Sequence, residues 1–381
     1  MKGVNLSRLG SPWYSYREDL GKVGMALDRG CRLFRLCLSK NAWDADASVG
    51  GVTYRQHCRD VVDLIRGRGG YIVTNEHCYA EWTGAASYKE LGLLFTQPAL
   101  QTSWINTWKA AISALNPDWH EFVNEPTEAA LSGTSLTNAQ LLVKYRAFMD
   151  TAIPSYRSII PSLPIYVMGQ PFWDPIPLLN NIEASPPPYR IDGLSIHNYS
   201  IASNATQDIE DAYKAGNPSL ARQLIEARLI TKNDVPRAQG MGLDVYFSEV
   251  GTIYMRRDGS GLPNTYWSPW MQVTYDILNA HGCSWSQHSL IPNTSAVAFG
   301  MIKASTYTHE ADVGIPVGEL NAIGRLWADN LSEIISDPVA LISTPILVTF
   351  TVDGGQYPSG TTLMVPRGSV IDVSLPETVT A

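Results

Sequence analysis

Short apolar segments alternate with longer segments of helical periodicity from the first residues of this chain to about residue 335. The short segments are rich in β-branched and aromatic residues, which is typical of buried strands. Apolar residues recur every three to four positions in the segments between them, which predicts helices. Eight strands are predicted in this way: Gly3–Leu6, Leu33–Leu38, Tyr71–Thr74, His120–Val123, Ile165–Met168, Gly193–Ile196, Asp244–Ser248 and Cys283–Ser286.

Eight alternating units predict an α/β protein with a (β/α)₈ barrel over residues 1–336. The segment Leu100–Leu115 illustrates the helices, since Trp104 and Trp108 recur on one face and are expected to pack on the barrel. A doubly wound sheet usually has fewer strands and a glycine-rich phosphate-binding turn after the first strand. No such turn follows Gly3–Leu6, so the barrel is favoured.

The pattern changes after about Asp337. Residues 346–352, 361–365 and 369–375 alternate as strands around the turn Asp353-Gly354-Gly355. A segment of this size rarely builds an independent core. We expect residues 337–381 to be a small β-rich unit, either a linker module that packs on the barrel or the start of a β-sandwich truncated at Ala381, and we favour truncation.

Composition excludes several classes of protein. The formal net charge is -8 and only 17% of residues are charged, with no cluster of Lys and Arg that would bind nucleic acid. No apolar run approaches the about 20 residues that cross a bilayer. We expect a secreted protein whose export signal is not part of this sequence, and a cytoplasmic location stays open as the alternative.

Five cysteines are spread through the chain without close pairs. An odd number without metal-ligand spacing argues against a disulfide framework or a zinc site, and buried free thiols are expected instead. The sequence therefore predicts no metal and no cofactor.

Polar residues gather at the ends of the predicted strands, where (β/α)₈ barrels carry their reacting groups. Among them are two glutamates, Glu125 and Glu249, each directly after an apolar run. Cleavage of a glycosidic bond needs two carboxyl groups that face one sugar. The strand-end set is Arg35, His77, Asn124, Glu125, His197, Tyr199, Glu249 and Trp285.

This ordered set resembles glycoside hydrolase family 5, the cellulase family, in clan A of the retaining (β/α)₈ glycosidases. The resemblance rests on Asn124-Glu125-Pro126, then His197-Asn198-Tyr199, then Glu249-Val250-Gly251, and covers roughly Met1–Ser336. It implies that Glu125 is the general acid/base and Glu249 the nucleophile. It also implies substrate-binding roles for Arg35, His77, Asn124, His197, Tyr199 and Trp285.

Each implied role has a physical requirement. The acid must hold a proton, and the nucleophile must stay ionised beside cationic or donor partners such as Arg35 and Tyr199. Asn124 is expected to bond the sugar 2-hydroxyl. Trp285 is expected to form the apolar floor of the sugar site, with a core tryptophan as the alternative.

Two assignments remain open at the sequence level. Glu76 stands directly before His77 and is the alternative residue to point into the site. The nucleophile segment Ser248-Glu249-Val250-Gly251 replaces the frequent Gly-Glu-Phe-Gly, so the chain is expected to belong to a divergent branch.

The resemblance implies an endo-acting β-1,4-glucanase that cleaves a β-linked polysaccharide or oligosaccharide by double displacement. A β-mannanase and an exo-β-glycosidase are the alternatives within the family, and a non-catalytic carbohydrate-binding barrel is the alternative of another class. A metal-dependent hydrolase is disfavoured, because the first strand lacks a His-X-His pair and Arg35 would repel a cation. Two long connections, residues 200–242 and 252–270, are expected to wall the site.

Overall fold

The computed structural model describes residues 1–9, 17–78, 91–126, 136–169, 174–199, 207–251, 266–291, 301–303, 314–332, 349–352, 355–357 and 371–374. The chain divides into two compact units, Met1–Ser332 and Glu333–Ala381. Among the described helices, none has the length and apolar character needed to cross a membrane.

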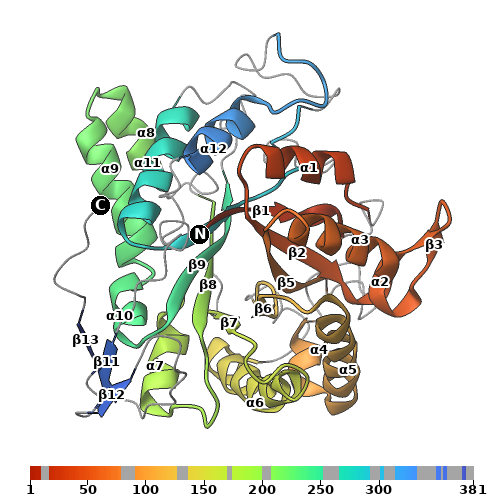
Figure 1. The fold of residues 1–381 in the computed structure, drawn as a ribbon. Helices are drawn as coiled ribbons and strands as arrows, with labels where there is room; N and C mark the ends of the chain where they lie inside the picture. The colour runs from red at the N-terminus through yellow and green to blue at the C-terminus, as the bar shows by residue number, and fades with distance from the viewer. Residues whose placement is uncertain are drawn as a thin grey trace. The chain divides into compact units, whose positions relative to one another are not determined.

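Eight parallel strands of the first unit close into a barrel in the order β1-β10-β9-β8-β7-β6-β5-β2 (Figure 1). All eight predicted strands are present, and several extend further at their C-terminal ends. The (β/α)₈ barrel is therefore confirmed. The strands are β1 (Lys2–Leu6), β2 (Leu33–Ser39), β5 (Tyr71–Cys78), β6 (Trp119–Phe122), β7 (Ile165–Met168), β8 (Gly193–Tyr199), β9 (Asp244–Gly251) and β10 (Ser284–Gln287), and a small hairpin is formed by β3 (Ser48–Val49) and β4 (Val52–Thr53).

Helices connect successive strands, and their ends follow local sequence signals. Thr53 accepts a hydrogen bond from the backbone of Gln56 at the start of α3, and Thr137 and Gln140 form a reciprocal capping box at the start of α6. The helices are α1 (Leu20–Asp28), α2 (Lys40–Ala45), α3 (Tyr54–Arg66), α4 (Leu91–Thr96), α5 (Pro98–Leu115), α6 (Asn138–Arg157), α7 (Ile176–Ala184), α8 (Gln207–Lys214), α9 (Pro218–Glu226), α10 (Val235–Gly240), α11 (Trp267–Ala280) and α12 (Ala322–Ser332). Part of the connection 200–242 is thus helical, in α8, α9 and α10.

Side chains along each barrel strand alternate between the barrel interior and the helix layer. Near the N-terminal ends the interior is filled by a cluster of large side chains: Leu33, Val73, Trp119, Tyr166 and Tyr246. Two residues further along the same strands the interior becomes polar, because Arg35 follows Leu33 and Glu121 follows Trp119. Arg35 and Glu121 are fully buried and ion-paired at 2.6 Å. The apolar layer therefore supports a charged layer below the strand ends.

A bulge interrupts this alternation in β9. Phe247 pairs with Ile196 of β8, but the next pair joins Glu249 to His197, so Ser248 is an extra residue. Ser248 Oγ lies 3.2 Å from Glu121 in the interior, and strict alternation would turn Glu249 outward. The bulge instead lets two consecutive side chains face the interior, which is a common use of bulges beside active sites.

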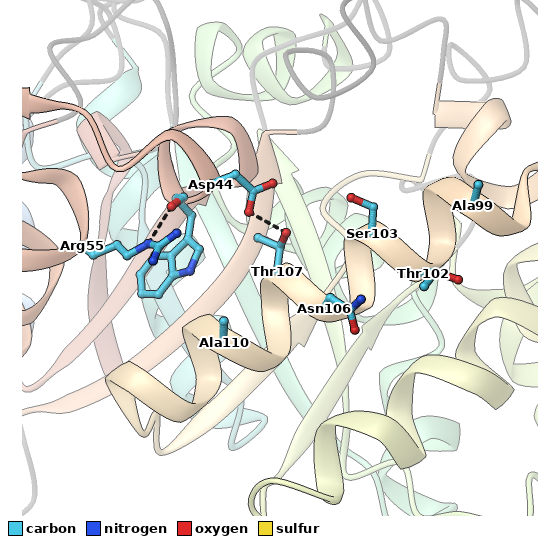
Figure 2. Close-up of a pocket in the computed structure, with 9 residues that line it drawn as sticks. Asp44, Arg55, Ala99, Thr102, Ser103, Asn106, Thr107 and Ala110 are labelled. Carbon is cyan, nitrogen blue, oxygen red and sulfur yellow. Dashed lines mark hydrogen bonds between the residues drawn. The ribbon is translucent and has the colours of Figure 1, made fainter.

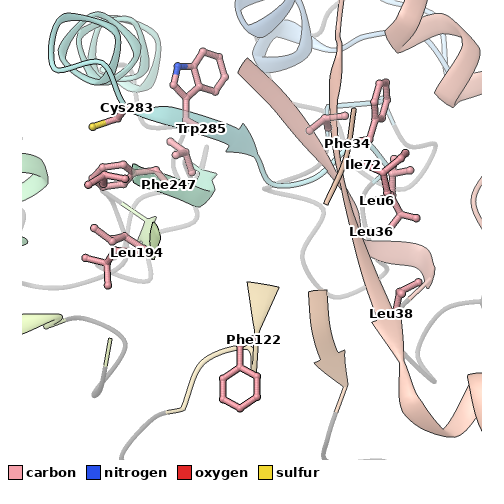
Figure 3. Packing of buried hydrophobic residues seen from close by; sticks show 14 of the residues in the cluster. Leu6, Phe34, Leu36, Leu38, Ile72, Phe122, Leu194, Phe247, Cys283 and Trp285 are labelled. Carbon is pink, nitrogen blue, oxygen red and sulfur yellow. The ribbon is translucent and has the colours of Figure 1, made fainter. Parts of the chain in front are cut away.

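The outer faces of the strands pack against the helices in one large apolar core (Figure 3). Trp104 and Trp108 of α5 are fully buried there, as expected. Trp285 of β10 also faces this layer. Its ring stacks on Tyr275 of α11 with centroids 4.4 Å apart, and its indole N–H donates to Asn279 Oδ1 at 3.1 Å.

The described cysteine side chains are buried free thiols, as expected. Cys31, Cys37, Cys58 and Cys283 are free thiols, and all four are buried. Burial raises the pKa of each of these thiols, so they stay protonated and behave as small apolar side chains.

The second unit contains a three-stranded antiparallel sheet in the order β12-β11-β13. The strands are β11 (Thr349–Val352), β12 (Gly355–Tyr357) and β13 (Ile371–Ser374). β11 and β13 fall within predicted strands, whereas β12 was not predicted. The strand expected at 361–365 lies outside the described residues.

Replacing Trp285 by alanine should destabilise the barrel unit by about 3–5 kcal/mol, because it opens a cavity against Tyr275 and removes the bond to Asn279. Urea unfolding measures this change. Val143→Ala is the control, since Val143 is 63% exposed and its truncation should change the free energy of unfolding by less than about 0.5 kcal/mol. A Trp285→Ala variant as stable as the control would contradict the packing.

Candidate active site

The C-terminal ends of the barrel strands bring seven of the eight predicted site residues into one connected group. They come from four strands, β2, β5, β8 and β9, and from the turn after β6, so residues up to 214 positions apart in sequence are in direct contact. The seven are Arg35, His77, Asn124, Glu125, His197, Tyr199 and Glu249.

Glu249 is the centre of the group. Its side chain is 4% exposed, and Arg35 Nη1 donates to its Oε1 at 2.6 Å. The Tyr199 hydroxyl donates to its Oε2. His197 Nε2 lies 3.5 Å from Oε1, and His288 Nδ1 lies 3.6 Å from Oε2. Both oxygens of this carboxylate are thus held by partners from other strands.

These partners keep Glu249 ionised. Burial alone would raise the pKa of Glu249, but His197, His288, Arg35 and His77 together lower it well below its usual range. Burial also lowers the pKa of His77, to about 3, and that of His288. The guanidinium of Arg35 carries its positive charge at any working pH and ion-pairs directly with Glu249.

Arg35 binds both Glu121 in the barrel interior and Glu249 in the site. Its Nε and Nη2 donate to the two oxygens of Glu121 at 2.6 and 2.9 Å. Nη2 also donates to Asn124 Oδ1 at 2.7 Å, and Nη1 donates to Glu249. One fully buried cation thus fixes two carboxylates and one amide.

Glu125 faces Glu249 across His197. One of its oxygens lies 2.8 Å from His197 Nδ1, and its side chain is 20% exposed. Its backbone has a left-handed φ of 45°, and its N–H donates to Met168 Sδ at 3.1 Å. One oxygen each of Glu125 and Glu249 and one nitrogen of His197 lie within 4.8 Å of one another. The two carboxyl groups can therefore reach the same bond.

Near the C-terminal end of β5, His77 rather than Glu76 points into the site. His77 faces the site, with Nδ1 3.0 Å from Asn75 Oδ1 and 3.9 Å from Glu249. Glu76, the alternative, turns to the helix layer, where it contacts Trp104 and Tyr156. Alternation along the strand separates the two neighbours.

The assignment of Trp285 to the sugar site is wrong. Trp285 is fully buried against Tyr275, on the helix side of β10. Side chains alternate along this strand, so Ser286 and His288 face the interior while Trp285 and Gln287 face the helices. Ser286 Oγ bonds the Tyr246 hydroxyl at 2.7 Å, and Gln287 Oε1 accepts from Tyr275. His288 is the residue that this strand end brings beside Glu249.

Sequence reasoning missed three side chains of the group: Glu121, His288 and Cys37. Glu121 could have been found as a charge inside an apolar strand, complementary to the charge of Arg35. His288 could have been found because it stands two positions after Ser286, so the side chains of both residues face the barrel interior. Cys37 lies two positions after Arg35, and its Sγ is 3.5 Å from Nη1 of that residue.

Two triads of this group have ligand atoms close enough for a metal ion: Cys37 with His77 and Glu249, and Glu125 with His197 and Glu249. Both triads include Glu249, whose carboxylate is already ion-paired with Arg35. A fixed guanidinium in contact with a shared ligand opposes a divalent cation.

A separate groove of about 520 Å³ lies on the helix layer between α2 and α5 (Figure 2). Within it, Thr107 Oγ1 donates to Asp44 at 2.7 Å and Arg55 Nε donates to the carbonyl of Trp43 at 2.7 Å. Asp44 is the only carboxylate among its lining residues. Because the groove lacks a pair of facing carboxyl groups, the strand-end group is the candidate active site.

Comparison with known proteins supports the fold. No protein-family model matches the sequence, and no curated protein matches it. A cellulose synthase subunit Z from Clostridioides difficile superposes with a TM-score of 0.59 at 16% identity, covering 87% of this chain and 99% of its own.

Two further solved structures are similar to the same extent. An endoglucanase from Pseudomonas stutzeri gives a TM-score of 0.56 at 13% identity, covering 88% of this chain and 95% of its own. An endo-1,4-beta-D-mannanase from Thermotoga petrophila gives 0.55 at 11% identity, covering 87% and 98%. The chain is a (β/α)₈ barrel of the kind found in these proteins, with two carboxylates facing each other at its strand ends. This is the fold that the resemblance to glycoside hydrolase family 5 implied.

Stability should report the ionised state of Glu249. The pKa of Glu249 is lowered in the folded protein, so its ionisation stabilises the fold above the unfolded pKa of about 4.3, and this contribution is lost as pH falls below that value. The free energy of unfolding of wild type minus that of Glu249→Gln should be constant from about pH 6 to 8 and should fall below about pH 4.3. Urea unfolding at each pH measures the difference, with exposed Asp63→Asn as the control for removal of a carboxylate. A difference that stays constant to about pH 3 would contradict the ion pair.

Proposed function

We propose that this protein is a retaining glycoside hydrolase. The observation that carries the proposal is the approach of Glu125 and Glu249, since one carboxylate oxygen of each lies within 4.8 Å of the other. Retaining glycosidases hold their carboxyl groups about 5–5.5 Å apart, whereas inverting enzymes need about 6.5–9.5 Å to admit a water molecule. The spacing supports direct attack by one carboxylate.

The environments of the two carboxyl groups divide the roles. Glu249, held ionised by Arg35 and Tyr199, is the nucleophile that forms a bond to the anomeric carbon. Glu125, which is more exposed, gives its proton to the leaving oxygen as the glycosidic bond breaks. Glu125 then takes a proton from water, whose oxygen attacks the anomeric carbon and releases Glu249. His197 bonds Glu125 and orients it through both steps.

The proposed substrate is a β-1,4-linked glucan, cleaved within the chain. Support comes from the similar structures, of which one is named as an endoglucanase and another as an endo-1,4-beta-D-mannanase. A β-mannan backbone and exo-action on the same linkage are the alternatives. Glucose and mannose differ at the 2-hydroxyl, which Asn124 is expected to contact.

A carbohydrate-binding barrel without activity would be free to lose a carboxylate or its supports. Here both glutamates are present, and each has a hydrogen-bonded partner on another strand. This arrangement favours catalysis over binding alone.

Reducing-sugar release from β-glucan, carboxymethylcellulose, mannan, glucomannan, xylan and xyloglucan tests the proposal. We expect wild type to act on one backbone, Glu249→Gln to lose at least about 10³-fold in kcat, and Glu125→Gln about 10²–10⁴-fold. Glu226→Gln, on the outer helix α9, is the matched control and should keep full activity.

The anomeric configuration of the first product, followed by NMR, tests the mechanism. Retention is expected. Inversion, or full activity in Glu249→Gln, would rule out the assigned nucleophile, and mannan as the preferred backbone would replace the glucanase assignment by the mannanase alternative.

A further inference from the structure

Glu76 is a buried acid that the proposed mechanism does not use. It lies on β5 beside His77 but faces the helix layer, and it has no exposed surface. Its Oε1 accepts from the Tyr156 hydroxyl at 2.7 Å and lies 3.0 Å from His120 Nε2. Its Oε2 accepts from Trp104 Nε1 at 2.7 Å and from the backbone N–H of Val123 at 3.1 Å. The carboxylate thereby ties β5 to β6, α5 and α6.

The bond to Val123 connects this residue to the site. The carbonyl of Glu76 also accepts from the backbone N–H of Asn124 at 3.0 Å. One residue therefore holds two consecutive amides of the segment that leads into Glu125.

That segment has an unusual backbone. Val123 has a φ of 46° and Glu125 a φ of 45°, so left-handed residues stand on both sides of Asn124. A β-branched residue in this region is a conformational outlier, which persists only where surrounding bonds enforce it. The turn gives Asn124 its bond to Arg35 and Glu125 its bond to His197.

Three hydrogen-bond partners of the Glu76 carboxylate, Trp104, Val123 and Tyr156, act as donors, so the site is suited to a side chain that accepts. The Trp104 indole and the Val123 amide can only donate. Burial, with the Glu76 carboxylate beside it, raises the pKa of Tyr156 well above its usual range, so the hydroxyl keeps its proton and donates as well.

We propose that Glu76 is a positioning residue, whose Oε2 holds the Val123–Glu125 turn in its left-handed conformation and so aims Glu125 at the leaving oxygen. This inference rests on the proposed function, because it assigns Glu76 a part in protonating the leaving group. Glu76 does not touch the substrate or the reacting atoms.

The test compares two substitutions of similar size. Glu76→Met removes both acceptor oxygens. Glu76→Gln keeps one oxygen, which can still accept from Trp104 and Val123 while its NH₂ group faces Tyr156 and His120, both of which can accept. We expect Glu76→Gln to retain the turn and Glu76→Met to lose it. Tyr156→Phe controls for loss of the helix-layer bond, because it leaves the Val123 bond intact.

The readout is the dependence of kcat/KM on the leaving group. An oligosaccharide needs protonation by Glu125, whereas a 2,4-dinitrophenyl glycoside of the same sugar leaves without it. Glu76→Met should lose about tenfold or more on the oligosaccharide and less than about threefold on the dinitrophenyl glycoside. Glu76→Gln and Tyr156→Phe should show no such selectivity. Equal losses on both substrates, or an unaffected Glu76→Met, would overturn the proposal.

A crystal structure of Glu76→Met decides the positioning role separately from activity. We expect Val123 or Glu125 to leave the left-handed region and the 2.8 Å contact between Glu125 and His197 to break. An unchanged turn would refute positioning by Glu76. Should the wild type hydrolyse neither substrate, the proposed function fails, and the structure of the variant still decides whether Glu76 holds the turn. If Glu76→Met does not fold, Glu76→Asp, which withdraws the carboxylate by one methylene, takes its place in both measurements.

Discussion

The guanidinium of Arg35 is the interaction on which the rest of the site depends. It is fully buried, and it binds Glu121 through two bonds, Glu249 through one and Asn124 through one. Removing a charge from water is costly unless partners surround it, and here one cation is shared by two buried carboxylates. Every nitrogen of the guanidinium is engaged, so its orientation is fixed. The carboxylate of Glu249, the proposed nucleophile, is consequently ionised and held still before any substrate arrives, which is the preorganisation that lowers a reaction barrier.

Two departures from regular backbone aim the reacting groups. The extra residue Ser248 in β9 turns Glu249 into the interior, and the left-handed backbone at Val123 and Glu125 turns the side chain of Glu125, the proposed acid, toward it. Both departures occur where a strand has ended or is about to end, above the apolar layer that fills the lower barrel. The regular part of each strand stabilises the barrel through packing, and the irregular end orients the side chains of the site. Glu76 of β5, whose side chain faces the helix layer, supports the left-handed turn at Val123–Glu125, because its carboxylate accepts a hydrogen bond from the backbone N–H of Val123.

The barrel was predictable because its signal is repeated. Each of the eight strands is a short apolar run between helical segments, so an error at one boundary does not alter the number of strands. The paired glutamates were also predictable, since Asn124-Glu125-Pro126 and Glu249-Val250-Gly251 are local motifs that follow such runs. The ends of the strands were less predictable from the sequence. β5 continues to Cys78 and β8 to Tyr199, because pairing with neighbouring strands extends them through polar residues.

The sequence by itself determined the alternation of strands and helices, the kind of barrel and the presence of two glutamates, Glu125 and Glu249, at its strand ends. Tertiary structure alone decided which side each residue faces at the strand ends. Trp285 turned out to pack on Tyr275, and His288 took the place beside Glu249, while Glu76 and His77 turned to opposite sides. A one-residue shift of register moves a side chain from the interior to the helix layer. Register depends on pairing with strands distant in sequence, which no local pattern encodes.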